Sequence, residues 1–362
     1  MQRALELAEG GRGRVSPNPL VGAVIVRDGA VIGEGFHAEL GGLHAERAAL
    51  ADCATRGEDP SGATMYVTLE PCAHQGRQPP CTDAITEAGI ARVVIASDDP
   101  SEKAAGRGPG ILRDAGVEVE FAAGAEAAAA RLLNQPFRKH ARTGQPLVTL
   151  KMAMSLDGRV ATAGGDSKWI SGERSRELVH RWRADSDAVA VGIGTALADD
   201  PRLNAREVGA PRQPARVVFD SRARLPLDSQ LVRSAGEQRL IAVVSPEADP
   251  ARLQALGAAG AETVLTAGAD PGERLRAALT ALGQLEITSL LLEGGPVLAG
   301  SFAAAGELDE ARLFIAPLLL GGGAPPLAGE GVATVAEAAR ALATESEQVG
   351  EDVLLRARLK EW

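Results

Sequence analysis

The sequence predicts an α/β protein of two domains. Its 362 residues exceed the roughly 100 to 200 residues of an ordinary single domain. Apolar residues make up 45% of the chain and charged residues 24%, a composition typical of folded globular proteins. Short aliphatic runs alternate with helical patterns through both halves, which favours sheets packed against helices. We therefore expect two separate α/β cores.

The first half predicts strands and helices in alternation. Apolar runs predict strands at residues 21–26, 31–33, 64–69, 92–96 and 117–121. Arg27-Asp28-Gly29 has the composition of a tight turn between the first two strands. Helical spacing predicts a helix from His44 and others at residues 82–88 and 125–133.

A domain boundary is expected in the stretch Arg142-Thr143-Gly144-Gln145-Pro146, which has turn residues and no apolar periodicity. The first domain should span residues 1–143 and the second residues 147–362. Strands of the second domain are expected at residues 147–153, 188–191, 215–219, 240–244, 263–266, 289–293, 311–320 and 352–359. Helices are expected at residues 174–182 and 273–282.

Net charge and hydropathy argue against a nucleic-acid-binding protein and a membrane protein. The net charge of −10, from 48 acidic and 38 basic residues, argues against a broad nucleic-acid interface and leaves room for a local basic pocket. Residues 1–10 lack the apolar core of a signal peptide, and the longest aliphatic runs are too short to cross a bilayer. We expect a cytoplasmic protein that binds neither nucleic acid nor membrane, in which clustered cysteines bind metal.

A zinc site is predicted from His44, Cys72 and Cys81. His44-Ala45-Glu46 opens a helix, Pro71-Cys72 follows a strand, and eight residues separate the two cysteines. One nitrogen and two sulfur ligands leave a fourth tetrahedral position open, as in catalytic zinc sites. Glu46 is then free to move a proton between water and substrate. This matches the H-x-E and P-C-x-x-C signature of zinc nucleobase deaminases, except for the longer spacing between the cysteines.

Other interpretations of these residues stay open at this stage. The histidine and the two cysteines could occupy unrelated core positions, or they could hold a structural zinc with His74 as the fourth ligand. Cys53 lies on the same predicted helix as Glu46 and is expected to be a small buried core residue.

The motifs together resemble the RibD family of bifunctional riboflavin-biosynthesis deaminase-reductases. The resemblance rests on Pro17-Asn18-Pro19, Val21-Gly22, His44-Ala45-Glu46 and Thr68-Leu69-Glu70-Pro71-Cys72 to Cys81. It implies a cytidine-deaminase-like α/β/α sandwich for the first domain, and substrate contacts from Asn18, His37 and Arg77. From the residues alone, Asn18 could equally be a turn residue and Arg77 a solvated loop charge.

The second half also resembles this family, whose reductase domain has a dihydrofolate-reductase-like α/β fold. The matching segments are Lys151-Met152-Ala153-Met154-Ser155-Leu156-Asp157-Gly158-Arg159, Ser167-Lys168-Trp169-Ile170, Thr195-Ala196-Leu197-Ala198-Asp199-Asp200-Pro201-Arg202-Leu203 and Glu293-Gly294-Gly295-Pro296. Glycines after a strand and before a helix suit a phosphate, although the segment is not G-x-G-x-x-G.

The resemblance implies an NADPH site and a substrate site in this half. The expected cofactor contacts are Ala153, Trp169, Thr195, Asp199, Ser221, Gly295, Pro296, Val297, Leu298, Ala299, Gly300 and Ser301. The expected substrate contacts are Lys151, Ser167, Arg183, Asp199, Leu203, Arg206 and Glu293, of which the two arginines suit a ribose phosphate. Alternatively, Trp169 could be a core residue, and Asp199 and Gly294-Gly295 plain turns.

The family's activity gives the functional expectation. A diaminopyrimidinone ribosylamine phosphate would lose a ring amino group at one Zn²⁺ per chain, and NADPH would then reduce the ribosyl group to ribityl. A homo-oligomer is expected. Two other functions remain possible from the sequence: a nucleic-acid-editing deaminase, and a zinc-stabilised protein whose second half only binds a ligand.

Overall fold

The computed structural model describes residues 1–76, 78–102 and 104–362. The chain forms two compact units, Met1–Gly144 with Trp362, and Gln145–Glu361. We expected Trp362 in the second domain, but it packs with the first unit. Its backbone N–H donates to Gln135 Oε1 at 2.8 Å, and its carbonyl oxygen accepts from Arg138 Nε at 2.7 Å.

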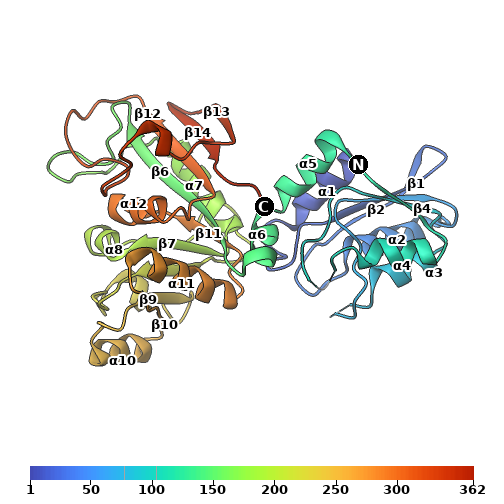
Figure 1. The fold of residues 1–362 in the computed structure, drawn as a ribbon, viewed down its shortest axis with the longest axis horizontal. Coiled ribbons are helices and arrows are strands. Elements are labelled where there is room, and N and C mark those ends of the chain that lie inside the picture. Colours follow the sequence, from blue (N-terminus) through green and yellow to red (C-terminus); the bar gives the residue numbers. More distant parts are fainter. Residues whose placement is uncertain (77, 103) are drawn as a thin grey trace. The chain divides into compact units, whose positions relative to one another are not determined.

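The first unit is a five-stranded sheet with helices on both faces (Figure 1). The strand order is β2-β1-β3-β4-β5, in which β1 is antiparallel to β2 and β3, and β3, β4 and β5 are parallel. The strands are β1 (Gly22–Arg27), β2 (Ala30–Phe36), β3 (Thr64–Val67), β4 (Arg92–Ile95) and β5 (Glu118–Phe121). The helices are α1 (Gln2–Ala8), the short 3₁₀ turn η1 (Glu9–Gly11), α2 (Ala45–Arg56), α3 (Cys81–Glu87), α4 (Arg107–Asp114), α5 (Gly124–Leu133) and α6 (Gln135–Thr143).

Two glycines allow helices to lie close against the first hairpin. A Cβ at Gly22 would come within 2.0 Å of the Ala4 carbonyl oxygen in α1, and one at Gly35 within 2.3 Å of Ala49 N in α2. The hairpin turns as expected, with Asp28 and Gly29 at φ 51° and 79°. Because Ala23 pairs with Gly35, the close approaches at Gly22 and Gly35 lie on opposite faces, as an α/β/α sandwich requires.

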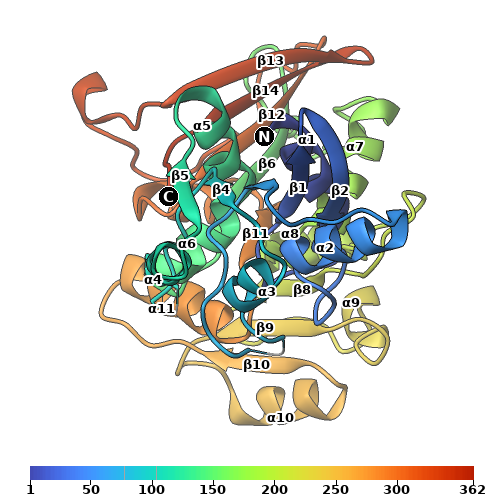
Figure 2. The same ribbon diagram turned by 90° about the vertical axis from the view of Figure 1, so that its right-hand side faces the viewer.

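The second unit contains one nine-stranded sheet of order β10-β9-β8-β7-β11-β6-β12-β14-β13, with β10 and β13 at its two edges (Figure 2). Neighbouring strands from β10 to β12 are parallel, and β14 pairs antiparallel with both β12 and β13. The strands are β6 (Leu147–Ser155), β7 (Ala188–Gly192), β8 (Ala215–Phe219), β9 (Leu240–Val244), β10 (Glu262–Leu265), β11 (Ser289–Leu292), β12 (Glu310–Ala316), β13 (Ala343–Val349) and β14 (Asp352–Arg358).

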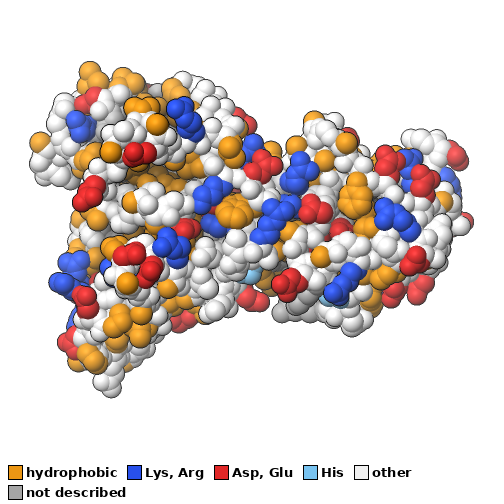
Figure 3. All heavy atoms as spheres, in the orientation of Figure 1, with side chains coloured by type: hydrophobic (Ala, Val, Ile, Leu, Met, Phe, Trp, Pro, Cys, Tyr) orange, Lys and Arg blue, Asp and Glu red, His pale blue; other side chains and the backbone are white. Residues whose placement is uncertain are grey.

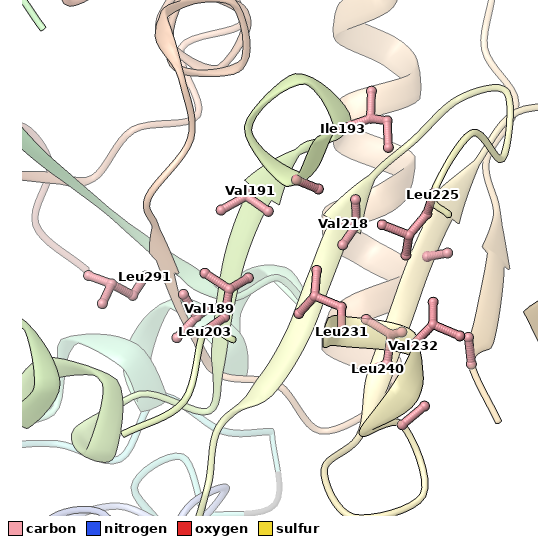
Figure 4. Packing of buried hydrophobic residues seen from close by; sticks show 14 of the residues in the cluster. Val189, Val191, Ile193, Leu203, Val218, Leu225, Leu231, Val232, Leu240 and Leu291 are labelled. Atoms are coloured by element: carbon pink, nitrogen blue, oxygen red, sulfur yellow. The ribbon is translucent and has the colours of Figure 1, made fainter. Parts of the chain in front are cut away.

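Both faces of this sheet are covered by helices, because its strands are apolar on both sides. Val189 and Val191 of β7 point into one buried cluster, with α7, α8, α9 and α10 (Figure 4), while Ala188 and Ala190 point into the other, with α11 and α12. The helices are α7 (Glu173–Asp185), α8 (Ile193–Asp199), α9 (Gln230–Arg233), α10 (Pro250–Ala258), α11 (Pro271–Gln284) and α12 (Pro296–Ala304), and a 3₁₀ turn η2 spans Val335–Glu337.

The structure corrects two expectations for the last part of the chain. The strand expected at residues 311–320 ends at Ala316, where Pro317 interrupts it, and β13 was not predicted. Strand β13 has the polar sequence ATESEQV and an exposed edge position, so it lacks the apolar pattern that marks buried strands. Among the described residues, no helix is long and apolar enough to cross a membrane.

Candidate functional sites

Three predicted zinc ligands converge at the ends of secondary-structure elements in the first unit. His44 is the N-cap residue of α2, Cys72 follows β3, and Cys81 is the first residue of α3. His44 Nδ1 lies 3.5 Å from Cys72 Sγ and 3.4 Å from Cys81 Sγ. Tetrahedral zinc with ordinary Zn–S and Zn–N bonds would hold such atoms about 3.6 Å apart. The three donor atoms therefore fit zinc.

The fourth coordination position is not filled by another of the described protein groups. The group of potential ligand atoms within 4.8 Å of one another comprises His44, Cys72 and Cys81, and His74 does not belong to it. Cys53 is fully buried in the core of α2 and is not in the group either. This donor set is that of a catalytic zinc with one open position.

Glu46 lies in the first turn of α2 and is only 3% exposed. Burial, together with the nearby charge of Cys72, raises the pKa of this carboxyl to about 6. A hydrogen bond with Cys81 lowers the pKa of Cys72 to about 4, so a thiolate is favoured there. A carboxyl that titrates near neutral pH beside a metal site suits general acid–base chemistry.

Asn18 and His37 lie together beside the zinc ligands. The Asn18 amide nitrogen is 3.1 Å from His37 Nε2, and His37 Nδ1 is 2.9 Å from the Leu43 carbonyl oxygen. With Nδ1 donating to Leu43, Nε2 accepts from Asn18, and burial lowers the pKa of His37. The His37 ring packs edge-on against that of His44, with centroids 5.5 Å apart. Arg77, expected here as a substrate contact, lies outside the described residues.

Glu70 supports the zinc-ligand loop and was not singled out from the sequence. Its carboxylate is buried and accepts backbone N–H groups near the start of α4, including those of Gly106 and Gly108. A Cβ at Gly108 would lie 2.2 Å from the Pro71 carbonyl oxygen, so α4 packs closely against the residue before Cys72. In the sequence, Glu70 is an acidic residue immediately before Pro71-Cys72, three residues after the end of β3 at Val67.

A cavity of about 1290 Å³ opens in the second unit. Most of the predicted cofactor and substrate contacts line it, while Ser221, Ala299, Gly300 and Ser301 do not. The predicted residues that line the cavity are Lys151, Ala153, Ser167, Trp169, Arg183, Thr195, Asp199, Leu203, Arg206, Glu293, Gly295, Pro296, Val297 and Leu298.

Arg183 and Glu293 form an ion pair in the wall of the cavity. Arg183 Nε and Nη2 bind the two carboxylate oxygens of Glu293 at 2.6 and 2.9 Å, and Arg183 Nη1 donates to the Asn204 carbonyl oxygen. Burial opposes ionisation of Glu293, but the guanidinium outweighs it and holds the pKa of Glu293 below its usual value. Burial lowers the pKa of Lys151.

Three more of the predicted contacts, Trp169, Thr195 and Gly295, lie in the wall of the cavity. Trp169 is 71% exposed, with the Arg176 guanidinium 4.7 Å from its ring, so it is not a core residue. Gly295 is the N-cap of α12, and its N–H donates to Thr195 Oγ1 at 3.1 Å. The first turn of a helix has backbone N–H groups without intrahelical partners, so the start of α12 beside Thr195 suits the phosphates of a dinucleotide.

Comparison with known proteins gives the family. The model of the cytidine and deoxycytidylate deaminase zinc-binding region matches residues 1–97, and that of the RibD C-terminal domain matches residues 146–355. The riboflavin biosynthesis protein RibD of Actinobacillus pleuropneumoniae is 44% identical over 98% of this chain and 93% of its own length. That of Escherichia coli K12 is 41% identical over 98% and 97%. The chain belongs to the RibD family.

Solved RibD structures have the same architecture. RibD of Acinetobacter baumannii, form 1, superposes with a TM-score of 0.87 at 39% identity, covering 99% of this chain and 98% of that one. The deaminase/reductase of Thermotoga maritima superposes with a TM-score of 0.87 at 36% identity, covering 99% and 97%. As a RibD protein the chain is a bifunctional enzyme of riboflavin biosynthesis, with zinc-dependent deaminase and NADPH-dependent reductase activities. This assignment is supported over the two alternatives considered from the sequence, a nucleic-acid-editing deaminase and a zinc-stabilised protein whose second half only binds a ligand.

Proposed function

We propose that residues 1–143 form the deaminase and that His44, Cys72 and Cys81 hold its zinc. The spacing of the three donor atoms is the observation that carries this proposal. Zinc bound there would activate a water molecule as a Lewis acid. The substrate is 2,5-diamino-6-(5-phosphoribosylamino)pyrimidin-4(3H)-one, one ring amino group of which is replaced by oxygen and released as ammonia.

Glu46 is the proposed proton carrier of the deamination. Its buried carboxylate accepts a proton from the attacking water and passes it first to the ring nitrogen and then to the departing amine. The pKa of about 6 allows both the uptake and the release of a proton near neutral pH. Asn18, oriented by His37, is proposed to hydrogen-bond the pyrimidine edge, and Arg77 to bind the phosphate tail.

Residues 147–362 are proposed to form the reductase. NADPH would transfer a hydride to C1 of the opened ribosyl group, whose attached nitrogen takes up a proton. Arg183 and Arg206 were both expected to bind the ribose phosphate, but their surroundings differ. The fork of Arg183 is occupied by Glu293, whereas Arg206 is exposed and hydrogen-bonds only weakly to Asn204 Oδ1 at 3.3 Å. We therefore propose Arg206 as the phosphate contact and Arg183 as the residue that positions Glu293.

The remaining contacts are proposed as the resemblance assigns them. Ser167, Leu203 and Lys151 would face the substrate, and the start of α12 the cofactor phosphates. On the face shown in Figure 3, basic and acidic side chains are interspersed on each unit, unlike the continuous basic surface of proteins that follow a nucleic-acid backbone. A small phosphorylated substrate is consistent with this distribution.

Glu46→Gln tests the deaminase assignment. The variant should retain one zinc per chain and lose ammonia release by about a hundredfold or more, because the amide cannot carry the proton. NADPH oxidation with the deaminated product should persist. Glu87→Gln, on the exposed side of α3, is the matched control and should leave both activities intact. Loss of zinc from Glu46→Gln, or retained ammonia release, would contradict the assignment.

We also propose that the protein is cytoplasmic and forms a homo-oligomer. Leu319, Val332, Val335 and Leu342 are large apolar residues exposed in one segment of the second unit, as is common at subunit interfaces. Sedimentation equilibrium would test the association, and a monomer at micromolar concentration would contradict it.

A further inference from the structure

The buried side chain of Asn134 holds the backbone of a residue 114 positions earlier in the chain. Asn134 is 2% exposed and is the N-cap residue of α6, where an asparagine side chain normally accepts a backbone N–H of its own helix. This side chain makes no such cap hydrogen bond. Its Oδ1 instead accepts the Leu20 N–H, and its Nδ2 donates to the Leu20 carbonyl oxygen, both at 2.8 Å.

The two hydrogen bonds of Asn134 fix the chain just before β1. The next residue, Val21, is held separately, because its carbonyl oxygen accepts the His37 N–H at 2.9 Å. At Leu20 the Asn134 amide takes the place of a neighbouring strand, since it binds both the N–H and the carbonyl group of one residue. The backbone therefore has a fixed position at Leu20 as well as at Val21.

The segment Pro17-Asn18-Pro19 depends on this anchor, because proline has no backbone N–H. Asn18 has the only backbone N–H of the segment and donates it to the Val15 carbonyl oxygen at 2.9 Å. Leu20 is the first residue after Asn18 with an N–H, and that N–H binds Asn134. A shift of Leu20 would therefore move Asn18 as well.

The side chain of Asn18 requires an accurate position. Its amide nitrogen lies 3.1 Å from His37 Nε2, and such a hydrogen bond weakens steeply when its geometry is disturbed. With the nitrogen bound to His37, Asn18 would meet the pyrimidine edge through Oδ1, which accepts ring or amino N–H groups.

Helix α6 provides a fixed base for Asn134. Arg138, one turn later, is 2% exposed and donates to Ser97 Oγ at 3.0 Å and to the Asp98 carbonyl oxygen at 2.9 Å. Ser97 and Asp98 follow β4, so α6 is attached to the end of a central strand. The amide of Asn134 is therefore held in place before any substrate binds.

We propose that Asn134 is a positioning residue of the deaminase, which holds Leu20 so that Asn18 can bind the pyrimidine ring. This inference rests on the proposed substrate contact of Asn18 and adds the residue that fixes it. In this role Asn134 acts through Asn18 and has no contact with the substrate.

Hydrogen exchange tests the anchor without turnover. Asn134→Leu keeps the volume of the side chain and cannot hydrogen-bond to Leu20. The amides of residues 16–22 should then exchange about tenfold faster than in the wild-type protein, the effect of losing one or two net hydrogen bonds. Gln135→Met is the matched control, because Gln135 is also 2% exposed and binds the backbone of Trp362. It should leave the exchange of residues 16–22 unchanged.

The kinetics of ammonia release test the effect on substrate binding. Asn134→Leu should raise KM by about five- to tenfold, the value of one hydrogen bond, and change kcat by less than about threefold. A contact made equally in the ground state and the transition state affects KM alone. Zinc content and NADPH oxidation with the deaminated product should stay at wild-type values, which a general loss of folding would not allow. Gln135→Met should change KM by less than about twofold.

A double-mutant cycle tests whether Asn134 acts through Asn18. In an Asn18→Ala background, Asn134→Leu should lower kcat/KM by less than about twofold, since the contact that it positions is already lost. Losses that multiply in the double variant, or unchanged exchange and KM in Asn134→Leu, would overturn the proposal. An unchanged KM in Asn18→Ala would overturn the substrate role of Asn18 and this proposal with it. Wild-type protein that releases no ammonia would instead overturn the deaminase function, and the exchange of residues 16–22 would still test the anchor.

Discussion

Separating Arg183 from Glu293 should destabilise the second unit. The side chains are 14% and 9% exposed and joined by two short hydrogen bonds. Removing one partner of a buried ion pair costs about 3 to 5 kcal/mol, and the cavity beside this pair favours the lower end, about 3 kcal/mol. For a unit of about 200 residues, this corresponds to a loss of roughly 6 to 12 °C in Tm.

The assay is calorimetry of Glu293→Gln, Arg183→Met and the double variant. The double variant should lose less stability than the sum of the single variants, by about 2 kcal/mol, because the second change removes a charge that is already unpaired. As a control, Arg181→Gln breaks the exposed Arg181–Glu177 pair on the same helix and should cost less than about 0.5 kcal/mol.

The stabilisation of the fold by ionised Glu293 should decrease at low pH. The pKa of Glu293 is lower in the folded protein than its usual value, so its ionised form stabilises the fold. That contribution is complete above the pKa of the unfolded state, about 4.3, and is lost as the pH falls through the folded pKa. The difference in Tm between wild type and Glu293→Gln should therefore shrink below about pH 4. Additive single variants, or a Tm difference under about 1 °C at pH 7, would refute the reasoning.

Two further substitutions probe the packing around each site. Cys53→Ala should retain one zinc per chain in elemental analysis and cost about 1 kcal/mol, because Cys53 is a core residue of α2; a loss of zinc would contradict this. Gly300→Ala should lower the Tm of the second unit by an amount equivalent to about 1 to 3 kcal/mol and weaken NADPH binding, since its Cβ would lie 1.7 Å from the Ala328 carbonyl oxygen. An unchanged Tm would show that residue 328 can move at little cost.

The sequence predicted the parallel core of each sheet because those strands are buried on both faces and are apolar along their length. Strand β13 was not predicted, because it lies at an edge of the sheet and its polar side chains are exposed. The α12 segment could be recognised from Glu293-Gly294-Gly295-Pro296, because glycine and proline carry local conformational signals.

Contacts between residues distant in sequence account for most of what the sequence could not predict. Arg183 and Glu293 are separated by 110 positions, and nothing local indicates that they pair. From the sequence alone, Arg183 is expected as a substrate contact, and its pairing with Glu293 cannot be foreseen. In the same way, the role of Glu70 depends on backbone N–H groups more than 30 positions away. The zinc ligands were an exception because their residue types identify the chemistry even when their spacing in the chain is wide.

In both proposed sites, an anionic group lies at the start of a helix that follows a strand. In the first unit, Cys81 opens α3 and donates its N–H toward Cys72 Sγ at 3.4 Å, so backbone dipoles stabilise thiolate charge. In the second unit, the start of α12 offers the same kind of dipole to phosphate. The dipole alone does not discriminate among anions. Discrimination must come from side chains at neighbouring strand ends.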